Sequence, residues 1–285
     1  MKLKLFFALV TAVLVFNACK KTDSTDPGIS FPKTILNVAY GTAAMQVMDI
    51  YLPANRSSSD TRVLVMIHGG GWSAGDKSDM TPFVDSFQRR FPNFSVFNVN
   101  YRLAGNGTNL FPTQELDIKQ AIEFIYSKRS EYAVSDKFAL LGVSAGAHLS
   151  LLQAYKYEEP VKVRAVVDFF GPTDMRAMYD SPATPLGALA MLNVMGITPQ
   201  QNGDLYAQSS PINYINEFSS PTLIFHGGAD NVVKHEQSDS LFARLDSANV
   251  IATYVKYPTQ NHGWTGDTLY HSFNQVQSFL ETRMQ

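Results

Sequence analysis

Short apolar runs alternate with amphipathic segments along most of this chain. Six runs have the length and composition of strands: residues 63–67, 95–100, 138–141, 163–169, 222–225 and 251–257. The first of them is apolar at every position, which is typical of a strand covered on both faces. Five segments between the strands have helical periodicity: residues 81–90, 114–127, 147–155, 236–245 and 268–284. This alternation predicts an α/β fold with a mostly parallel central sheet and helices on both faces.

Two further strand-like runs precede the alternation, at residues 34–40 and 46–52, and Gly41 with other small residues separates them. Two strands joined in this way predict an N-terminal antiparallel hairpin. In a mostly parallel sheet, reactive groups gather on the loops at the carboxyl ends of the strands. The loops after the strands are therefore where we expect the chemistry.

The pattern G-x-S-x-G, which marks an activated serine, occurs at Gly71–Gly75 and again at Gly142–Gly146. Such a nucleophile sits on a sharp turn between a strand and a helix that begins at once, and small neighbours let the chain turn. Ser144 meets this requirement. After Ser73 the next helix signal is only Thr81-Pro82, an N-cap followed by a first-turn proline. Ser144 is therefore the predicted nucleophile and Ser73 a loop residue.

The segment HGGGW, residues 68–72, follows the first buried strand. An HGGG-type loop in this place supplies backbone N–H groups to the negatively charged oxygen of a tetrahedral intermediate. Consecutive glycines let those N–H groups approach the substrate without obstruction by side chains. Gly70 and Gly71 are the predicted donors, together with Ala145, the residue after the nucleophile. We expect His68 to brace the loop rather than to transfer protons.

A serine hydroxyl needs a base to remove its proton. Three histidines follow Ser144 far enough along the chain. His262 is the predicted base because it lies between the last strand and the last helix, with Gly263 leaving room for its ring. His235 begins one helix and His271 lies on the polar side of another, so both are expected to be solvated.

The acid of this motif order lies between the serine and the histidine. Asp230 is the predicted acid, since its loop follows the strand at 222–225, beside the strand that leads to His262. Asp174, which follows the preceding strand, stays open as the alternative. His226 and Asp117 are interpreted as structural, one at a strand end and one on a helix.

The motifs HGGGW, GVSAG, HGGADNVV and NHGW together resemble those of α/β-hydrolases of the carboxylesterase type. The resemblance is closest to bacterial acetyl-xylan and feruloyl esterases and to the hormone-sensitive-lipase group. It covers residues 35–282 and includes MDIYLP, GDK, NYRLA and FFGPTD. It implies an α/β-hydrolase fold and a serine esterase that works through an acyl-enzyme. The roles it implies are nucleophile for Ser144, acid for Asp230, base for His262, and oxyanion donors for Gly70, Gly71 and Ala145.

The lipase-like relatives carry an N-terminal helical cap that this sequence lacks, and residues 175–215 are the one stretch with room for a lid. So small a cap suggests an open site for a soluble or polysaccharide-borne ester. Trp72 and Trp264 flank the reactive loops and are candidates for stacking on sugar or aromatic rings, or for packing. Four methionines are candidates for an acyl pocket or for core packing: Met175, Met178, Met191 and Met195.

Two other functions stay open. The pair HGGAD and HG also resembles the C-terminal half of the prolyl-oligopeptidase group, so a peptidase or arylformamidase is the alternative within hydrolases. The large extra domain of those peptidases is not expected here, so this alternative ranks below the esterase. A tethered glycan-binding protein without catalysis is the alternative from another class, although no triad member is missing.

The composition excludes several other classes. The chain has 285 residues, a net charge of −2 and no run of Lys or Arg, so nucleic acid is not expected as a partner. Asp76 separates Gly75 from Lys77, so the end of a phosphate-binding loop is missing. The six histidines show no metal-ligand spacing. We therefore expect neither a cofactor nor a metal, and the oligomeric state is open.

The N-terminus has the features of a signal peptide. A short positive segment precedes a twelve-residue, almost wholly apolar stretch, residues 5–16, which is too short to span a bilayer comfortably. It ends near Cys19, the only cysteine, and residues 1–19 resemble a bacterial lipoprotein signal, although Phe16 and Asn17 are unusual there. We expect a membrane anchor at a lipidated Cys19, a flexible tether at 20–33 and a catalytic domain at 34–285 in the cell envelope. A secreted or periplasmic protein with an ordinary signal is the alternative.

Overall fold

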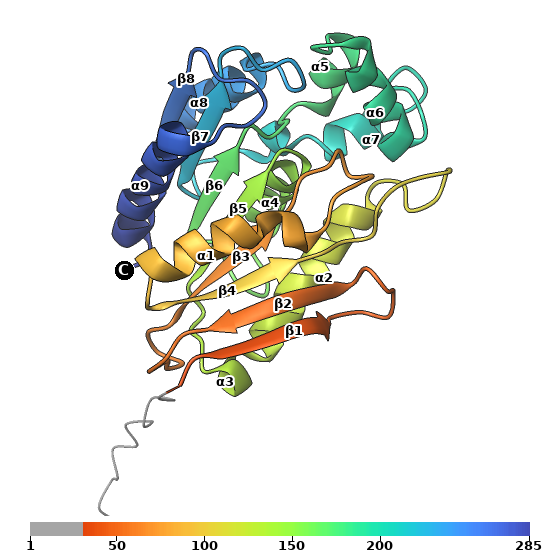
Figure 1. Cartoon of the computed structure of the whole chain (residues 1–285). Coiled ribbons are helices and arrows are strands. Elements are labelled where there is room, and N and C mark those ends of the chain that lie inside the picture. The colour runs from red at the N-terminus through yellow and green to blue at the C-terminus, as the bar shows by residue number, and fades with distance from the viewer. Residues whose placement is uncertain (1–30) are drawn as a thin grey trace, which may run out of the picture.

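The computed structural model describes residues 31–285, which form a single sheet with helices on both faces (Figure 1). The strands are β1 (Lys33–Ala39), β2 (Val47–Leu52), β3 (Arg62–Ile67), β4 (Phe94–Val99), β5 (Phe138–Val143), β6 (Ala165–Phe169), β7 (Thr222–Gly227) and β8 (Ala252–Tyr257). The helices are α1 (Thr81–Arg90), α2 (Thr113–Ser127), α3 (Arg129–Tyr132), α4 (Ala145–Lys156), α5 (Met175–Asp180), α6 (Pro185–Met195), α7 (Gly203–Gln208), α8 (Glu236–Ser247) and α9 (Gly266–Arg283), with 3-10 turns η1 (Lys77–Met80) and η2 (Pro211–Tyr214). Each strand and helix expected from the sequence is present.

The strands follow the order β1-β2-β4-β3-β5-β6-β7-β8. The pairs β1–β2 and β2–β4 are antiparallel, whereas every pair from β4 to β8 is parallel. This arrangement confirms the predicted mostly parallel sheet with an antiparallel hairpin at one edge, and it is that of an α/β-hydrolase fold. The carboxyl ends of β3, β5, β6, β7 and β8 therefore lie along one edge of the sheet, where their loops can meet.

The central strands place alternate residues in two separate hydrophobic cores. Val63, Val65 and Ile67 of β3 belong to a core that includes residues of α2, α4 and α8. Leu64 and Met66 belong to the core on the other face, which includes residues of α1 and α9. Because both faces of β3 are covered, its sequence is apolar throughout.

The stretch expected to hold a lid contains α5, α6 and α7. Figure 1 shows these three helices gathered beyond the carboxyl ends of the central strands. Met191 and Val194 of α6 are fully buried and join the core that contains α4, whereas Leu189 is exposed. The cap is therefore packed onto the sheet domain on one side and open to solvent on the other.

The start of α1 differs from the expectation. Thr81, predicted as an N-cap, is the first residue of the helix, and its N-cap Met80 has no side-chain capping bond. The capping side chain lies one turn earlier, where Asp76 accepts the N–H of Ser78 at 2.8 Å. The 3-10 turn η1 runs directly into α1, so the cap belongs to the turn rather than to the helix.

The start of the domain also differs. The sequence places residues 31–33 in the tether, but β1 begins at Lys33, and the carbonyl of Phe31 accepts a hydrogen bond from Arg56 Nη1 at 2.7 Å. The domain therefore includes these three residues. The signal-like segment, Cys19 and the rest of the expected tether lie outside the described residues. Within residues 31–285, no helix combines the length and apolar character needed to cross a membrane.

Candidate active site

Ser144 lies at the junction of β5 and α4, where the elbow pattern places it. Its φ of 54° and ψ of −119° are costly for a residue with a Cβ and are typical of strained functional turns. The N–H of Ser144 donates to the carbonyl of Phe169 on the neighbouring strand at 2.8 Å. A Cβ on Gly142 would lie 2.3 Å from the backbone of Gly146, and a Cβ on Gly146 would lie 2.2 Å from the carbonyl oxygen of Ile67. The sharp turn therefore depends on both glycines.

Ser73, the serine of the other G-x-S-x-G stretch, is exposed and lies in a turn. The N–H groups of Ser73 and Ala74 donate to the carbonyl of Gly70, at 3.2 and 2.9 Å. Ser73 does not line the pocket onto which Ser144 opens. The structure thus separates the two serines as the sequence interpretation does.

His262 reaches Ser144 from the loop between β8 and α9. Its Nε2 lies 2.9 Å from Ser144 Oγ, and its Nδ1 lies 2.7 Å from Asp230 Oδ2. An ionised carboxylate only accepts hydrogen bonds, so Nδ1 carries the proton and Nε2 offers its lone pair to the hydroxyl. The Phe170 ring packs against the imidazole, with 4.5 Å between the ring centroids. The three predicted side chains therefore form one continuous hydrogen-bonded chain.

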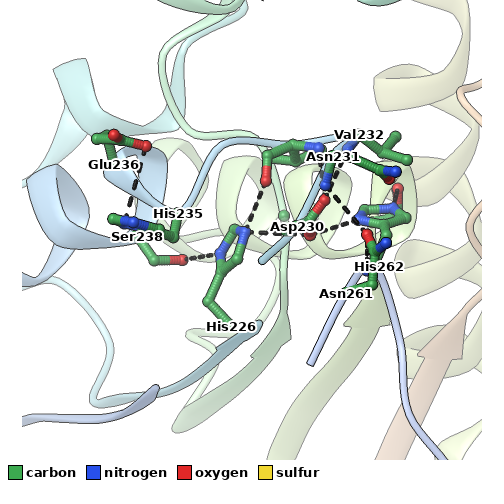
Figure 2. A network of polar contacts seen from close by, with 12 residues as sticks. His226, Asp230, Asn231, Val232, His235, Glu236, Ser238, Asn261 and His262 are labelled. Atoms are coloured by element: carbon green, nitrogen blue, oxygen red, sulfur yellow. Dashed lines mark hydrogen bonds and ion pairs between the residues drawn. The ribbon is translucent and has the colours of Figure 1, made fainter. Parts of the chain in front are cut away.

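Asp230 follows β7, and hydrogen bonds to backbone and histidine groups hold both oxygens of its carboxylate. Its Oδ1 accepts the N–H groups of Val232 and Val233 at 2.8 and 2.9 Å. Figure 2 shows the carboxylate between two histidines, His262 and His226, and His226 Nε2 lies 3.3 Å from Oδ2. Burial opposes ionisation of the carboxyl, but hydrogen bonds from His226, His262 and the backbone outweigh it and lower the pKa of Asp230 below its ordinary value. Asp230 is therefore an anion at neutral pH.

Asn261 joins the loop that carries the acid to the loop that carries the histidine. Its side-chain oxygen accepts the N–H of Asn231 at 3.0 Å and the N–H of His262 at 2.8 Å (Figure 2). One amide therefore fixes the spacing of the loops after β7 and β8. The sequence interpretation did not single out this residue.

His226 supports Asp230, a role that the sequence interpretation missed. The residue is fully buried in β7, with Nε2 at 2.9 Å from the carbonyl of Val233 and Nδ1 at 2.7 Å from Ser238 Oγ. A carbonyl oxygen only accepts, so Nε2 carries the proton, and the same N–H points toward Asp230. The available signal was the order H-x-x-x-D, which places a strand-end histidine within reach of an acid on the following turn.

The other candidates lie away from this chain of hydrogen bonds. Asp174, the alternative acid, is the N-cap of α5 and accepts a backbone N–H of its first turn at 2.9 Å. His235 precedes α8 and lies 3.0 Å from an oxygen of Asp239. His271 on α9 contacts the hydroxyl of Tyr257 at 2.8 Å. Asp230, rather than Asp174, is therefore the aspartate that meets the histidine beside Ser144.

The glycine loop after β3 lies beside Ser144. Gly70 and Gly71 have φ of 102° and 57°, and their N–H groups make none of the hydrogen bonds found among residues 31–285. Ala145 is the first residue of α4, so its N–H has no acceptor within the helix. A Cβ on Gly69 would lie 3.3 Å from Ser144 Cβ, which shows how closely the two loops approach. Gly70 and Gly71 line the same pocket as Ser144, and Ala145 directly follows Ser144 in the chain, so the assignment of the three as oxyanion donors stays a prediction.

His68 supports this loop, as expected. It is fully buried and stacks on Tyr101, with 4.4 Å between the ring centroids and 8° between the planes. The Tyr101 hydroxyl lies 3.1 Å from the carbonyl of His68 and 3.2 Å from that of Gly69. Burial lowers the pKa of His68, so the ring is neutral at pH 7. His68 does not line the pocket beside Ser144 and is not part of the hydrogen-bonded chain through His262.

Ser144 and His262 open onto a pocket of about 600 Å³. The glycine loop, α5, α6 and the loops after β6 and β7 form its walls, and among the described residues that line it none is Asp, Glu, Lys or Arg. Most of the side chains that line it are apolar, including Phe170, Pro172 and Met178. Such a pocket suits an uncharged ester.

Only some of the methionine and tryptophan candidates lie at this pocket. Met178 lines the pocket, whereas the other three methionines are buried in the core: Met175, Met191 and Met195. Trp72 also lines the pocket, but it is only 1% exposed, so it offers almost no face to a sugar ring. Trp264 does not line the pocket and donates its indole N–H to Ser272 Oγ at 2.9 Å.

A second cleft, of about 680 Å³, lies near the amino ends of β5, β6 and β7 and is lined by Asp136, Arg164 and Phe218 among others. It contains no serine–histidine pair, so the larger cleft is not the site of the hydrogen-bonded chain. In the described part of the chain, no group of three His, Cys, Asp or Glu residues is placed to hold a metal ion.

Several curated hydrolases have similar sequences. The chain is 25% identical over 244 residues to "Esterase LipC" of Mycobacterium tuberculosis, which covers 80% of this chain and 59% of LipC. It spans half to three-fifths of the length of the first curated relatives it matches. It is also 28% identical to "Dipeptidyl peptidase family member 6" of Caenorhabditis elegans, over 71% of this chain and 28% of that protein.

Two solved structures share the fold over most of the chain. A bifunctional GH43-CE protein of Bacteroides eggerthii superposes with a TM-score of 0.78 and 25% identity, over 88% of this chain and 35% of that one. A truncated carbohydrate esterase from gut microbiota superposes with a TM-score of 0.73 and 24% identity, over 91% and 98%. The family model BD-FAE matches residues 48–245, which include Ser144 and Asp230. The chain therefore belongs to the BD-FAE family.

Proposed function

We propose that this protein is a serine carboxylic-ester hydrolase that works through an acyl-enzyme. The observation that carries the proposal is the continuous chain of hydrogen bonds from Ser144 Oγ through His262 to Asp230, at a strained strand–helix turn that opens onto an uncharged pocket. Ser144 is the nucleophile, His262 the base and Asp230 the acid. Membership of an esterase-rich family and similarity to LipC support the same reaction class.

In the first step, Ser144 Oγ attacks the carbonyl carbon of the ester while His262 Nε2 takes the hydroxyl proton. The new O–C bond forms as the carbonyl electron pair moves onto the oxygen. The N–H groups of Gly70, Gly71 and Ala145 stabilise that oxyanion, and each donor of this kind is worth about 3 kcal/mol of the barrier. Asp230 holds His262 in the reactive tautomer and stabilises the imidazolium.

In the second step, the tetrahedral intermediate collapses. The bond between the carbonyl carbon and the alcohol oxygen breaks, and His262 Nε2 returns its proton to the departing alcohol. Water then repeats the sequence on the acyl-enzyme, with His262 taking its proton, and the acid leaves from Ser144. The histidine ends each cycle neutral, so no cofactor is required.

The substrate class proposed is an ester of a short-chain or aromatic acid carried by a carbohydrate. The uncharged lining of the pocket supports a neutral acyl group. The carbohydrate part of the proposal is supported by the two similar structures, of which one is a bifunctional GH43-CE protein and the other a carbohydrate esterase. Acetylated xylan and feruloylated arabinan are the polymers to test, and free acetate or ferulate is the product to measure.

The proposal extends to the place of action. The sequence of residues 1–19 supports a lipid anchor at Cys19 and a catalytic domain, residues 31–285, tethered to the cell envelope. Radiolabelled palmitate should be incorporated into the full chain and not into Cys19→Ala. Equal labelling of the two proteins, or none of either, would refute the anchor and leave the secreted or periplasmic alternative.

The catalytic proposal is tested by hydrolysis of p-nitrophenyl acetate by the wild type, Ser144→Ala and Ser73→Ala. Loss of a triad serine lowers kcat by about 10⁶-fold, so Ser144→Ala should lose about that factor and keep only the residual catalysis, about 10³- to 10⁴-fold over water, that the oxyanion donors and binding provide. Ser73→Ala should keep most of the activity because Ser73 is exposed outside the pocket. A dead Ser73→Ala variant would reverse the roles of the two loops.

Other outcomes would favour the other functions. Release of proline-terminated dipeptides without ester turnover would favour a peptidase. An inactive wild type that binds saccharides equally well with and without the Ser144 hydroxyl would favour a glycan-binding protein.

A further inference from the structure

The glycine loop that supplies two of the oxyanion donors contains a strained residue. Gly70, Gly71 and Trp72 are consecutive and all have positive φ, and for Trp72 the value is 59°. The left-handed region is strained for a bulky L-residue. A loop with this conformation persists only where surrounding contacts hold it, so the contacts of Trp72 decide where the neighbouring N–H groups lie.

Two hydrogen bonds hold Trp72. Its carbonyl accepts the N–H of Ala104 at 2.9 Å, and its indole Nε1 donates to His148 Nδ1 at 3.1 Å. The indole and imidazole rings meet edge to face, with 5.2 Å between centroids. His148 lies one turn after Ser144 on α4, and its backbone N–H donates to the Ser144 carbonyl at 3.1 Å. The contact therefore joins the oxyanion loop directly to the helix that begins at the nucleophile.

The surroundings of His148 fix its tautomer. Nε2 lies 2.7 Å from the carbonyl of Ser209, which follows α7 of the cap. The carbonyl only accepts, so Nε2 carries the proton and Nδ1 keeps the lone pair that receives the Trp72 N–H. Burial lowers the pKa of His148 to about 4, the bond to Ser209 opposes this shift, and the charge of Lys156 adds to it. The ring is thus a neutral bridge between loop, helix and cap.

We propose that His148 is a positioning residue for ester hydrolysis, which acts through Trp72 to hold the Gly70 and Gly71 N–H groups in place beside Ser144. The inference rests on the proposed function, because it assigns His148 to the oxyanion loop of that reaction. An oxyanion donor works at about 2.7–3.1 Å from the oxygen, and a misplacement of about 1 Å can cost about 10²-fold in rate. Losing the Trp72–His148 bond should therefore lower kcat with little change in KM.

Two substitutions of His148 each remove one of its two hydrogen bonds, the bond from Trp72 or the bond to Ser209. In His148→Asn the side-chain oxygen occupies the place of Nδ1 and can still accept from Trp72, but the donor to Ser209 is lost. In His148→Gln the amide nitrogen reaches the place of Nε2 and can still donate to Ser209, but the acceptor for Trp72 is lost. Both variants remove the imidazole from the same buried site, so a merely structural role predicts similar losses in the two.

The kinetic experiment measures kcat and KM for p-nitrophenyl acetate, with the Tm of each protein. We expect His148→Gln to lose about 10²-fold in kcat with KM within about twofold, as for removal of one oxyanion donor. His148→Asn should stay within about fivefold of the wild type. Adding Trp72→Phe to His148→Gln should cause little further loss, because the bond is already absent. Equal losses in the Gln and Asn variants, or no loss in either, would overturn the inference.

A spectroscopic measurement covers the case in which the variants fold poorly. The chain has two tryptophans, so Trp264→Phe leaves Trp72 as the only indole reporter. Protonation of His148 removes the acceptor and places a quenching imidazolium against the indole. Trp72 emission should therefore fall with a midpoint near pH 4, the pKa that burial gives His148, while far-UV circular dichroism is constant. Emission that does not change over this range, or that changes only as the protein unfolds, would contradict the contact.

Failure of this inference and failure of the proposed function look different. If the proposed function is wrong, either the wild type does not hydrolyse the ester or ester turnover survives Ser144→Ala. If only the inference is wrong, Ser144→Ala is inactive while the Gln and Asn variants of His148 behave alike.

Discussion

The two G-x-S-x-G stretches follow neighbouring strands, β3 and β5, and are held by different interactions. At residues 142–146, any side chain on Gly142 or Gly146 would collide with backbone atoms, so close packing forces the turn. At residues 71–75, a Cβ on Gly75 would lie 2.7 Å from the carbonyl oxygen of Gly69, but a Cβ on Gly71 would meet nothing within 4 Å. Hydrogen bonds within the loop backbone, between Trp72 and Ala104 and between Trp72 and His148 also shape this loop. In the elbow both glycines pack against backbone and the helix begins at once, whereas in the other stretch only one glycine does and a turn follows.

The two candidate acids differ in the same way. Asp230 and Asp174 both follow parallel strands. Only Asp230 contacts the histidine beside Ser144, whereas the carboxylate of Asp174 caps α5 by accepting a backbone N–H. Position after a strand is therefore necessary for a catalytic role in this sheet and is not sufficient for it. Four predictions test these contrasts, beginning with the largest effect.

Asp230→Asn should lower kcat by about 10⁴-fold, as replacement of a triad aspartate by asparagine does. The backbone N–H groups of Val232 and Val233 keep an oxygen at Oδ1. The new NH₂ group would then face the N–H of His262 and drive that ring into the wrong tautomer. Asp174→Asn is the matched control, because asparagine caps helices as well as aspartate. Single-turnover kinetics of the two variants would contradict the account if they lost equal activity.

Gly146→Ala should destabilise the fold by about 3 kcal/mol, the upper range for forced overpacking. The new methyl group would have to displace the carbonyl of Ile67, which is backbone of the central strand β3. Urea unfolding gives the change in the free energy of unfolding. An unchanged transition midpoint would show that the elbow does not depend on this contact.

Asp168→Asn should change how stability depends on pH. Burial raises the pKa of Asp168 to about 7, against the opposing effects of the Gly171 N–H and of His226. A carboxyl whose folded pKa lies above its unfolded value of about 3.9 contributes stability below about pH 4 and loses it as the pH rises through 7. The variant cannot ionise there, so its Tm relative to the wild type should be higher at pH 8 than at pH 5.

The control for this prediction is Asp246→Asn, because Asp246 is exposed on α8. Its Tm difference from the wild type should be the same at both pH values. A similar result for Asp168→Asn would mean that the carboxyl titrates normally in the folded protein.

Gly71→Ala should have the smallest effect on stability, about 1 kcal/mol, since the position has a left-handed φ but free space for a methyl group. Its effect on catalysis should be larger than its effect on folding, because the methyl group adjoins a proposed oxyanion donor. The measurements are Tm and kcat on p-nitrophenyl acetate. A fall in Tm with unchanged kcat would remove Gly71 from the oxyanion site.

The sequence was sufficient for the sheet, the elbow and the three side chains that the structure brings together. These follow local rules: period, turn chemistry and the order of loops along one sheet edge. The contacts that hold these groups in place could not be predicted from the sequence. Trp72 and His148 are 76 residues apart, and the tautomers of His148 and His226 are set by carbonyls of Ser209 and Val233 that no side-chain pattern reveals.

The methionines of the cap also could not be assigned from the sequence. The methionines at 175–195 have no sequence signal that separates pocket from core, and only packing places Met178 on the pocket. Side-chain partners across distant segments are a property of the assembled fold, whereas the type and order of its elements are written locally.

The most direct test of the central claim is to label the protein with a fluorophosphonate, which traps an activated serine, and to locate the adduct by peptide mass spectrometry. The account predicts a single adduct on Ser144, lost on denaturation before labelling and strongly reduced in Asp230→Asn. An adduct on Ser73, or an unmodified Ser144 in a protein that hydrolyses esters, would contradict it.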